Sequence, residues 1–168
     1  MNELELSSPR ALALPATRQG RAELQACLDG APGYFEAIEG GPAAPDAAAR
    51  LVEEAEADPE RRVLLLRARG DGEPLGVLDL YLHHPEPGVA HVGLLLLREA
   101  VQGRGLGREV VEALAGALAG AGFAELRASV ADETPGAQAF WERLGFEPAG
   151  RLDGGVTVYA LRIAAGQR

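Results

Sequence analysis

The sequence predicts an α/β fold built on one mixed central sheet. Three observations support this prediction. Short apolar runs of strand length recur after residue 61, turn-forming sequences separate the first three runs, and a glycine-rich segment joins the third run to a helical pattern. The predicted order from there is strand, strand, strand, helix, strand, helix, strand, strand. It implies antiparallel strands first, a parallel strand–helix–strand crossover in the middle, and helices flanking the sheet.

The first sixty residues predict a strand followed by helices. "ELEL" alternates in polarity and predicts a first strand that "RALAL" continues. Thr17 is a candidate N-cap for a helix through "RAELQACL", which Gly30 and Pro32 end. "GYFEAIEG" predicts one or two helical turns, and Asp46 is a candidate N-cap for the alanine-rich helix "DAAARLVEEAEA". Since no long linker divides the sequence, we expect a single domain over residues 1–168.

The rest of the sequence alternates between strand and helix patterns. "RVLLLRA" and "LGVLDLYL" flank the hairpin turn "RGDGEP", and the apolar run "VAHVGLLLL" is typical of the centre of a sheet. After the glycine-rich segment, an apolar stripe at four-residue spacing predicts a helix containing Leu106, Val110, Leu114 and Leu118. "ELRASV" predicts a strand. "PGAQAFWERL" predicts a helix that has Pro135 in its first turn and ends at Gly145, and the last two strands are "FEPAG" and "GVTVYALRI".

Composition and charge narrow the range of functions. The 168 residues include 16 basic and 25 acidic side chains, and the net charge of −9 has the wrong sign for nucleic-acid binding. No stretch approaches the roughly 18 apolar residues of a membrane helix, and the acidic start "MNELELSSPR" differs from a secretory signal. We therefore expect a cytoplasmic protein without a nucleic-acid or membrane partner. Cys27 is the only cysteine, which excludes an internal disulfide, and we expect it in the core.

The segment "VQGRGLGREVVEAL" has three glycines, Gly103, Gly105 and Gly107, directly before a helix. A helix N-terminus offers unpaired N–H groups and a partial positive charge, and glycines allow a phosphate to approach them. The segment does not match the P-loop pattern. It also fails the dinucleotide pattern G-x-G-x-x-G, because Arg108 or Val110 occupies the third glycine position.

A third pattern fits these glycines. Residues 102–107 read Q-x-x-G-x-G, which resembles the pyrophosphate-binding loop of the GCN5-related N-acetyltransferase (GNAT) family. "TPGAQAFWERLGFEPAG" resembles the late motif of the same family, N-x-x-A-x-x-F-Y-x-x-x-G-F, through Ala137, Phe140, Gly145 and Phe146. The resemblance implies a GNAT-like mixed sheet. In that arrangement residues 1–60 form a substrate-side strand and helices, and residues 61–163 form the acetyl-CoA-binding core.

The resemblance also implies a reaction, in which the acetyl group of acetyl-CoA passes to a primary amine by direct attack in a ternary complex. The pyrophosphate would lie on the loop, and the pantetheine arm would bond the backbone of the preceding strand. Thr134 replaces the asparagine of the family motif, and Trp141 replaces its tyrosine. The tyrosine is taken as an acid in the family, and an indole cannot act as an acid at useful pH. Carried over to this sequence, the coenzyme-binding residues are Leu95, Leu97, Gln102, Gly103, Arg104, Gly105, Leu106, Gly107, Arg108, Thr134 and Trp141.

The group that accepts the amine proton is sought on the strands. His91 lies in the strand before the glycine segment, and Asp79 is a charged residue among apolar ones in the preceding strand. We take His91 as the candidate base, which would give the activity a pH inflection between about 6 and 7. We take Asp79 as the candidate anchor for a cationic amine. Alternatively, His91 is a hydrogen-bonded sheet residue and Asp79 is structural. Tyr34 and Phe35 are candidates for the acceptor pocket, with core packing as the alternative.

Three functions stay open at this point. The leading one is an N-acetyltransferase that acts on a small-molecule amine or a peptide N-terminus. A non-catalytic acyl-CoA-binding module is the alternative that Trp141 favours. A nicotinamide-dependent oxidoreductase rests on the glycines alone and conflicts with Arg108. We expect no metal cofactor, and the edges of the last strands leave a homodimer open.

Overall fold

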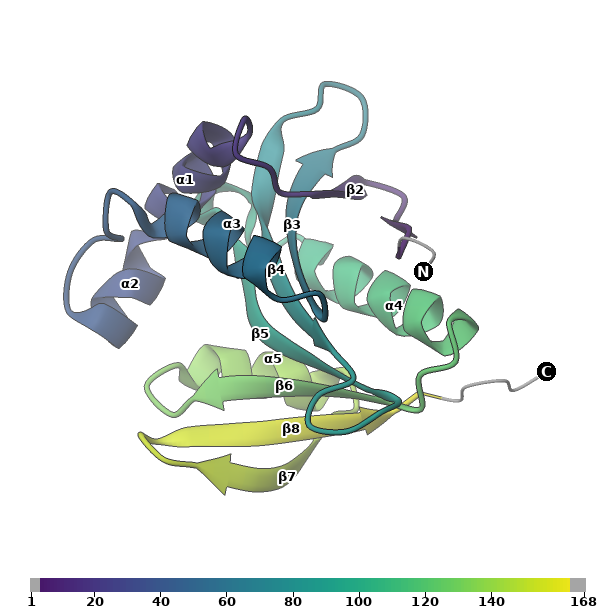
Figure 1. Cartoon of the computed structure of the whole chain (residues 1–168). Coiled ribbons are helices and arrows are strands. Elements are labelled where there is room, and N and C mark those ends of the chain that lie inside the picture. The colour runs from purple at the N-terminus through teal and green to yellow at the C-terminus, as the bar shows by residue number, and fades with distance from the viewer. Residues whose placement is uncertain (1–3, 164–168) are drawn as a thin grey trace.

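The structure is a computed structural model that describes residues 4–163, and it contains an eight-stranded sheet with helices on both faces (Figure 1). The chain begins with two short strands, β1 (Leu6–Ser7) and β2 (Ala11–Pro15), and three helices, α1 (Arg21–Asp29), α2 (Pro32–Glu39) and α3 (Ala47–Ala57). Three long strands follow, β3 (Arg61–Ala68), β4 (Pro74–Leu82) and β5 (Val89–Leu97). The remaining elements are η1 (Glu99–Val101), α4 (Leu106–Gly120), β6 (Glu125–Ala131), α5 (Pro135–Arg143), β7 (Glu147–Leu152) and β8 (Val156–Arg162).

The sheet has the strand order β1-β2-β3-β4-β5-β6-β8-β7. β5 and β6 pair in parallel through the crossover helix α4, and the other neighbouring strands pair antiparallel. This confirms the predicted mixed sheet, with antiparallel strands first and a parallel crossover in the middle. The parallel register runs from Val89↔Glu125 to Val92↔Ala128, and beyond it β5 and β6 diverge (Figure 1).

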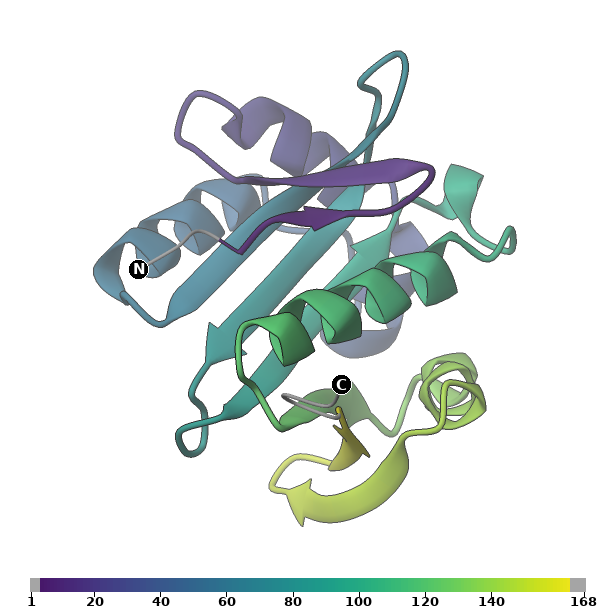
Figure 2. The same ribbon diagram turned by 90° about the vertical axis from the view of Figure 1, so that its right-hand side faces the viewer.

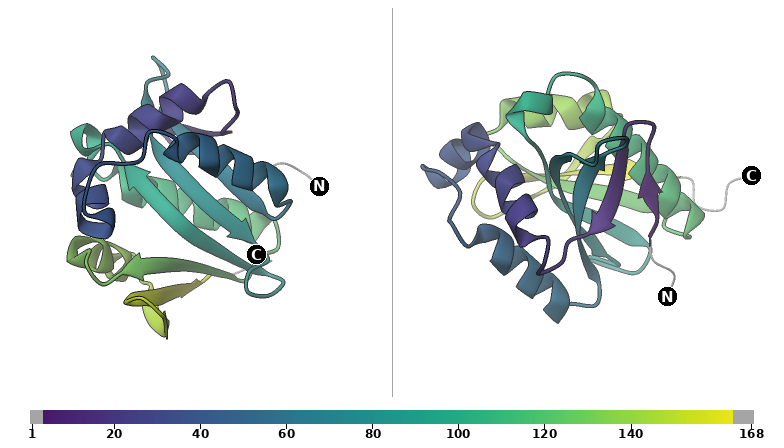
Figure 3. Two further views of the ribbon diagram at one scale, coloured as in Figure 1. Left: turned by 60° about the vertical axis from the view of Figure 1, so that its left-hand side comes forward. Right: turned by 90° about the horizontal axis from the view of Figure 1, so that it is seen from above.

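The sheet separates two hydrophobic cores, each covered by helices. α4 and α5 cover one face of the sheet, and α1 and α3 cover the other (Figure 2, Figure 3). Successive side chains of a strand point to opposite faces, so β4 contributes Leu78 to the core under α4 and Val77 to the core under α1. Within the described part of the chain, no helix is both long enough and apolar enough to cross a membrane.

The N-terminal third differs from the sequence prediction in detail. Two short antiparallel strands, β1 and β2, replace the single predicted strand, since Pro9 in the turn between them lacks a backbone N–H for pairing. α1 begins at Arg21, so the predicted cap at Thr17 is wrong: the Thr17 hydroxyl accepts a hydrogen bond from the Gly20 N–H instead. Asp46 does occupy the N-cap position of α3, but its carboxylate pairs with an arginine side chain four residues further on.

Cys27 lies in the core under α1 and is completely buried, as the sequence predicts. Burial raises the pKa of its thiol to about 11 because the thiolate would lose its hydration. The thiol is therefore protonated at neutral pH and contributes to packing rather than to chemistry.

Candidate active site

A cleft of about 650 Å³ opens where β5 and β6 diverge. Its walls are the end of β5, the glycine segment, the first turn of α4 and one side of α5, and Figure 2 shows α4 and α5 on the side of the sheet that faces the viewer. The residues that line this cleft include most of the predicted coenzyme-binding set: Leu95, Leu97, Gln102, Gly103, Gly105, Leu106, Gly107, Arg108 and Trp141.

α5 contributes more to this cleft than the sequence analysis assigned to it. The additional lining residues are Leu96, Gly136, Ala137, Phe140, Arg143 and Leu144. Ala137 and Phe140 are positions of the late motif, so the motif itself was the available signal. Because α5 has one side on the cleft and the other on the core, its apolar positions serve both.

The glycines of the loop have two different structural reasons. Gly103 and Gly105 have φ angles of 76° and 79°, in the left-handed region that residues with a Cβ rarely adopt. Gly105 is also the N-cap residue of α4. Gly107 is needed for space, because a Cβ there would lie 3.1 Å from the Phe140 ring. The loop thus turns sharply into α4, and α5 packs closely against the start of that helix.

Three predicted coenzyme-binding residues make contacts within the protein. The Gln102 side chain donates a hydrogen bond of 2.8 Å to the Leu97 carbonyl, which ties the loop to the end of β5. Arg104 and Thr134 do not line the cleft. The Arg104 carbonyl accepts a hydrogen bond from the turn between β1 and β2, and the Thr134 hydroxyl donates one of 2.7 Å to the Ala131 carbonyl.

Trp141 is both a core residue and a residue of the cleft wall. Its side chain is 5 % exposed and packs edge-on against Phe140 and Phe146, with ring centroids 5.2 Å and 4.9 Å away. It belongs to the core under α4 and α5 and also lines the cleft. The indole is therefore placed as a packing surface at the cleft wall.

A bulge in β5 decides the position of His91. Strict alternation would put His91, Gly93 and Leu95 on the same face, but the β4–β5 register skips Gly93. Leu95 packs against the core under α4, and the extra residue turns His91 to the opposite face. His91 consequently does not line the cleft of about 650 Å³, but lies on the opposite face of β5, close to the point where β5 leaves β6.

His91 is paired with Ser129 of β6, a residue that the sequence analysis did not identify. The His91 Nε2 atom lies 2.5 Å from Ser129 Oγ, and its Nδ1 atom is buried without a hydrogen-bond partner among the described residues. Burial, together with the charges of His84 and Arg127, lowers the pKa of His91 to about 4. The imidazole is therefore neutral at pH 7, and the expected inflection between 6 and 7 is corrected to about 4.

Asp79 already has a cationic partner. Its two carboxylate oxygens accept hydrogen bonds from Arg61 Nε and Nη2, at 2.9 Å and 2.8 Å. The side chains of this pair are 7 % and 10 % exposed, and the Arg61 guanidinium also lies 4.9 Å from the centre of the Tyr81 ring. The hydrogen bonds to Asp79 raise the pKa of Arg61. Because Arg61 balances the carboxylate charge, we no longer assign Asp79 as the anchor of a substrate amine.

A second cavity, of about 240 Å³, lies between α2 and α3 on the face of the sheet that carries His91. It reaches Leu94 of β5, and the predicted acceptor residues Tyr34 and Phe35 line it together with Ile38. Burial first, and then the charge of Glu39, raises the pKa of Tyr34. The cavity is lined by apolar and aromatic side chains together with three charged residues, Glu39, Arg50 and Glu54, and Glu54 accepts a hydrogen bond of 2.8 Å from Arg61.

The other two histidines are not grouped into a metal site. His83 stacks on Phe123 at 4.6 Å, and its Nδ1 atom accepts a hydrogen bond from the Gly88 N–H. Within residues 4–163, no three His, Cys, Asp or Glu side chains are close enough together to hold a metal ion.

Comparisons with known proteins agree with this arrangement. The sequence model of the acetyltransferase (GNAT) family matches residues 25–146. An acetyltransferase from Thermus thermophilus is 32% identical, with a TM-score of 0.83 over 94% of this chain and 99% of that chain. RimL, the ribosomal L7/L12 alpha-N-protein acetyltransferase in complex with coenzyme A, is 18% identical, with a TM-score of 0.77 over 96% and 99%. The ribosomal-protein-S18-alanine N-acetyltransferase from Escherichia coli is 17% identical, with a TM-score of 0.67 over 94% and 96%. No curated protein sequence matches the chain.

The sheet topology and the cleft on the glycine segment define a coenzyme-A-dependent acetyltransferase. The chain belongs to the GNAT acetyltransferase family, as its sequence resemblance indicated. Membership of a family of acetyl-CoA-dependent enzymes sets aside the non-catalytic binding module and the nicotinamide-dependent oxidoreductase.

We expect His91 to stay neutral down to about pH 5 and to gain a proton only near pH 4, because burial disfavours the imidazolium. An NMR titration of protein with labelled histidine, assigned with His91→Gln, measures this directly. Between pH 6.5 and about 4 the unfolded chain binds a proton at His91 that the folded protein does not bind. The free energy of unfolding is therefore unaffected by the titration of His91 above pH 6.5 and falls as the pH is lowered toward 4. His91→Gln should therefore lose less stability than the wild type over that range. A His91 signal that titrates at 6.5 would contradict the burial effect.

We expect Asp79→Ala to destabilise the protein by about 3 kcal/mol, because it leaves Arg61 buried without its main partner. Glu56→Ala is the matched control. It removes an exposed pair with Arg18, in which the Glu56 and Arg18 side chains are 46% and 71% accessible, and should cost only a small fraction of that. Urea unfolding of both variants gives the comparison. Equal stability of Asp79→Ala and the wild type would argue for a role in binding instead.

Proposed function

We propose that the protein transfers the acetyl group of acetyl-CoA to a primary amine by direct attack in a ternary complex. One observation carries this proposal: neighbouring residues of β5 line two separate cavities. The coenzyme cleft lies along Leu95 and Leu97, and the second cavity reaches Leu94 from the other face of the sheet. Two ligands bound in these cavities would approach each other at the end of the β5–β6 pairing.

The coenzyme would bind with its pyrophosphate on the main-chain N–H groups of residues 103–108. The N-terminus of α4 supplies the partial positive charge, and Arg104 and Arg108 would add charge at the rim. The pantetheine arm would follow the backbone of Leu95 and Leu97 as an added strand. Trp141 would pack against this arm, and Thr134 would take the place of the family asparagine at the start of α5.

The acceptor would enter the cavity between α2 and α3, where Tyr34 and Phe35 lie. The leucine, isoleucine and aromatic side chains of its lining would accept an amine attached to an apolar group. Glu54 is paired with Arg61, and Arg50 lines the cavity together with Glu39, so the charges there do not select against a substrate carboxylate. Both a small-molecule amine and a peptide N-terminus meet this condition. The protein N-termini in the names of two structural relatives support the second.

Ser129 and His91 would handle the amine proton. An ammonium group has a pKa of about 10, and a histidine with a pKa of about 4 is too weak a base to deprotonate it before the attack. We therefore propose that the amine enters as the free base. When the C–N bond forms, the nitrogen becomes acidic and passes a proton to Ser129 Oγ, which gives its own proton to His91 Nε2. The C–S bond then breaks, and the coenzyme A thiolate leaves and takes a proton from solvent. His91 returns its own extra proton to solvent, so that the turnover balances.

The organisation predicted from the sequence belongs to the same proposal. Residues 61–163 would form the coenzyme-binding core, and residues 1–60 would cover the acceptor face. β7 is an edge strand of the sheet, and Leu152 in it is 54% exposed, which supports a homodimer across this edge.

We expect a negative charge in the glycine loop to weaken coenzyme binding without unfolding the protein. Aspartate tolerates a positive φ and is a good N-cap residue, so Gly105→Asp should fold and repel the pyrophosphate. Gly105→Asn has the same shape without the charge and is the matched control. Calorimetry should give a dissociation constant for acetyl-CoA at least about tenfold higher for Gly105→Asp than for Gly105→Asn. Equal affinities would contradict the loop as the pyrophosphate site.

Transfer itself is tested with a panel of primary amines, measured as thiol release from acetyl-CoA. We expect amines with an apolar substituent to accelerate release. Ser129→Ala and His91→Gln should each lower kcat by about 10²-fold with little change in KM, as loss of a proton-transfer group does. Because the two residues would act as one unit, the double variant should lose no more than either single variant. Multiplicative losses would argue against a shared relay.

A further inference from the structure

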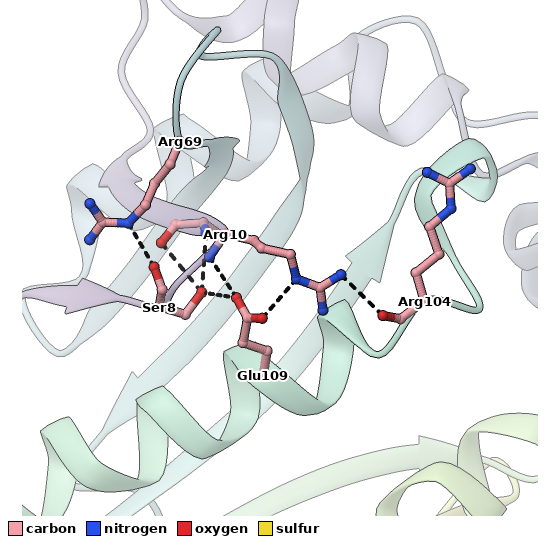
Figure 4. Close-up of polar contacts among 6 residues, drawn as sticks. Ser8, Arg10, Arg69, Arg104 and Glu109 are labelled. Atoms are coloured by element: carbon pink, nitrogen blue, oxygen red, sulfur yellow. Dashed lines mark hydrogen bonds and ion pairs between the residues drawn. The ribbon is translucent and has the colours of Figure 1, made fainter.

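The turn between β1 and β2 is anchored to the start of the coenzyme loop's helix. Figure 4 shows three groups from this turn converging on the Glu109 carboxylate of α4. The Ser8 hydroxyl and the Arg10 main-chain N–H donate to Oε2, and Arg10 Nε donates to Oε1 at 2.8 Å. The hydrogen bond from Ser8, followed by those from Arg10, lowers the pKa of Glu109. Arg10 is thereby held in a defined position beside the glycine loop.

From this position Arg10 also reaches the loop backbone. Its Nη1 atom donates a hydrogen bond of 3.1 Å to the Arg104 carbonyl, whereas the Arg104 side chain extends away from this contact (Figure 4). In a trans peptide the carbonyl and the following N–H point in opposite directions. By holding the Arg104 carbonyl, Arg10 also fixes the direction of the Gly105 N–H, which points opposite to that carbonyl within the same peptide plane.

Two charge effects add to this orientation. Glu109 places a carboxylate in the first turn of α4, where it would repel a phosphate, and the Arg10 guanidinium compensates that charge. The Arg10 Nη2 atom has no hydrogen-bond partner among residues 4–163. It lies 3.7 Å from the position that a Cβ of Gly105 would occupy, so a donor is left at the loop. The Arg10 side chain is 48% exposed, which leaves this group accessible to a ligand.

We propose that Arg10 is a positioning and binding residue for the coenzyme pyrophosphate. It fixes the orientation of the Arg104–Gly105 peptide, and it presents Nη2 to the pyrophosphate at the loop. The inference rests on the proposed coenzyme site. It extends that site to a residue of the N-terminal sixty, which the sequence analysis had placed on the acceptor side.

The test compares ligands that differ in their phosphates. Coenzyme A, 3′-dephospho-coenzyme A and pantetheine are titrated into the wild type, Arg10→Ala and Arg10→Lys, by calorimetry for the first two ligands and by NMR shifts for pantetheine. Arg10→Ala should bind both phosphorylated ligands about tenfold more weakly, as expected for a charged hydrogen bond. Its affinity for pantetheine, which has no phosphate, should equal that of the wild type. Arg10→Lys keeps the charge without the fork of donors and should lie between the two.

Arg69→Ala is the matched control, because Arg69 donates to the Ser8 carbonyl in the same turn but does not contact the glycine loop. It should bind coenzyme A like the wild type. An equal loss in Arg69→Ala, or a weaker affinity of Arg10→Ala for pantetheine, would reduce Arg10 to general support of the fold and overturn the proposal. A loss seen with coenzyme A but not with the dephospho form would overturn the assignment to the pyrophosphate. Failure of the wild type to bind coenzyme A would instead refute the proposed coenzyme site itself.

Discussion

The end of pairing between β5 and β6 is the constraint on which the site depends. β4 pairs with β5 as far as Gly76↔Leu97, whereas β6 pairs with it only as far as Val92↔Ala128. The second half of β5, from Gly93 to Leu97, is therefore held along one edge and open along the other. Backbone groups on an open strand edge require a partner, and an extended ligand with amide groups supplies one. The cleft is thus a strand position in the sheet that the protein itself leaves vacant.

The bulge at Gly93 lets one strand serve both faces of this position. Before the bulge, His91 faces the side of α1 and α3, and after it Leu95 and Leu97 face α4 and the cleft. A Cβ at residue 93 would lie 2.9 Å from the Tyr81 ring, so the glycine is required where the strand bends. Without the extra residue, His91 would share a face with the cleft. The bulge therefore separates the proposed proton relay from the proposed coenzyme site.

The features that the sequence predicted correctly are those with a local signal. Element order, the glycine loop and the start of α5 follow from periodicity, turn residues and motif spacing within single segments. Apart from the N-cap assigned to Thr17, the errors and omissions concern pairings between distant segments. The face of His91 depends on how β4 and β5 align, Ser129 gains its meaning only from its position beside β5, and Asp79 pairs with Arg61, which comes from the neighbouring strand β3. Such alignments cannot be read from either segment alone, since each strand satisfies its own alternation in more than one register.

In an acidic protein that binds a polyanionic coenzyme, charges close to the binding site must offset the repulsion from the net negative charge. The net charge of −9 acts at long range, but salt screens exposed charges beyond roughly 8 Å at physiological ionic strength. At the loop the relevant charges are therefore the start of α4 and its nearest side chains. Glu109 stabilises the N-terminus of α4 through the helix dipole, yet the same carboxylate competes with a phosphate for that end of the helix. In the proposed site the β1–β2 turn would resolve this conflict, because Arg10 neutralises Glu109 and holds the loop through the Arg104 carbonyl. The N-terminal hairpin would then be part of the anion-binding site.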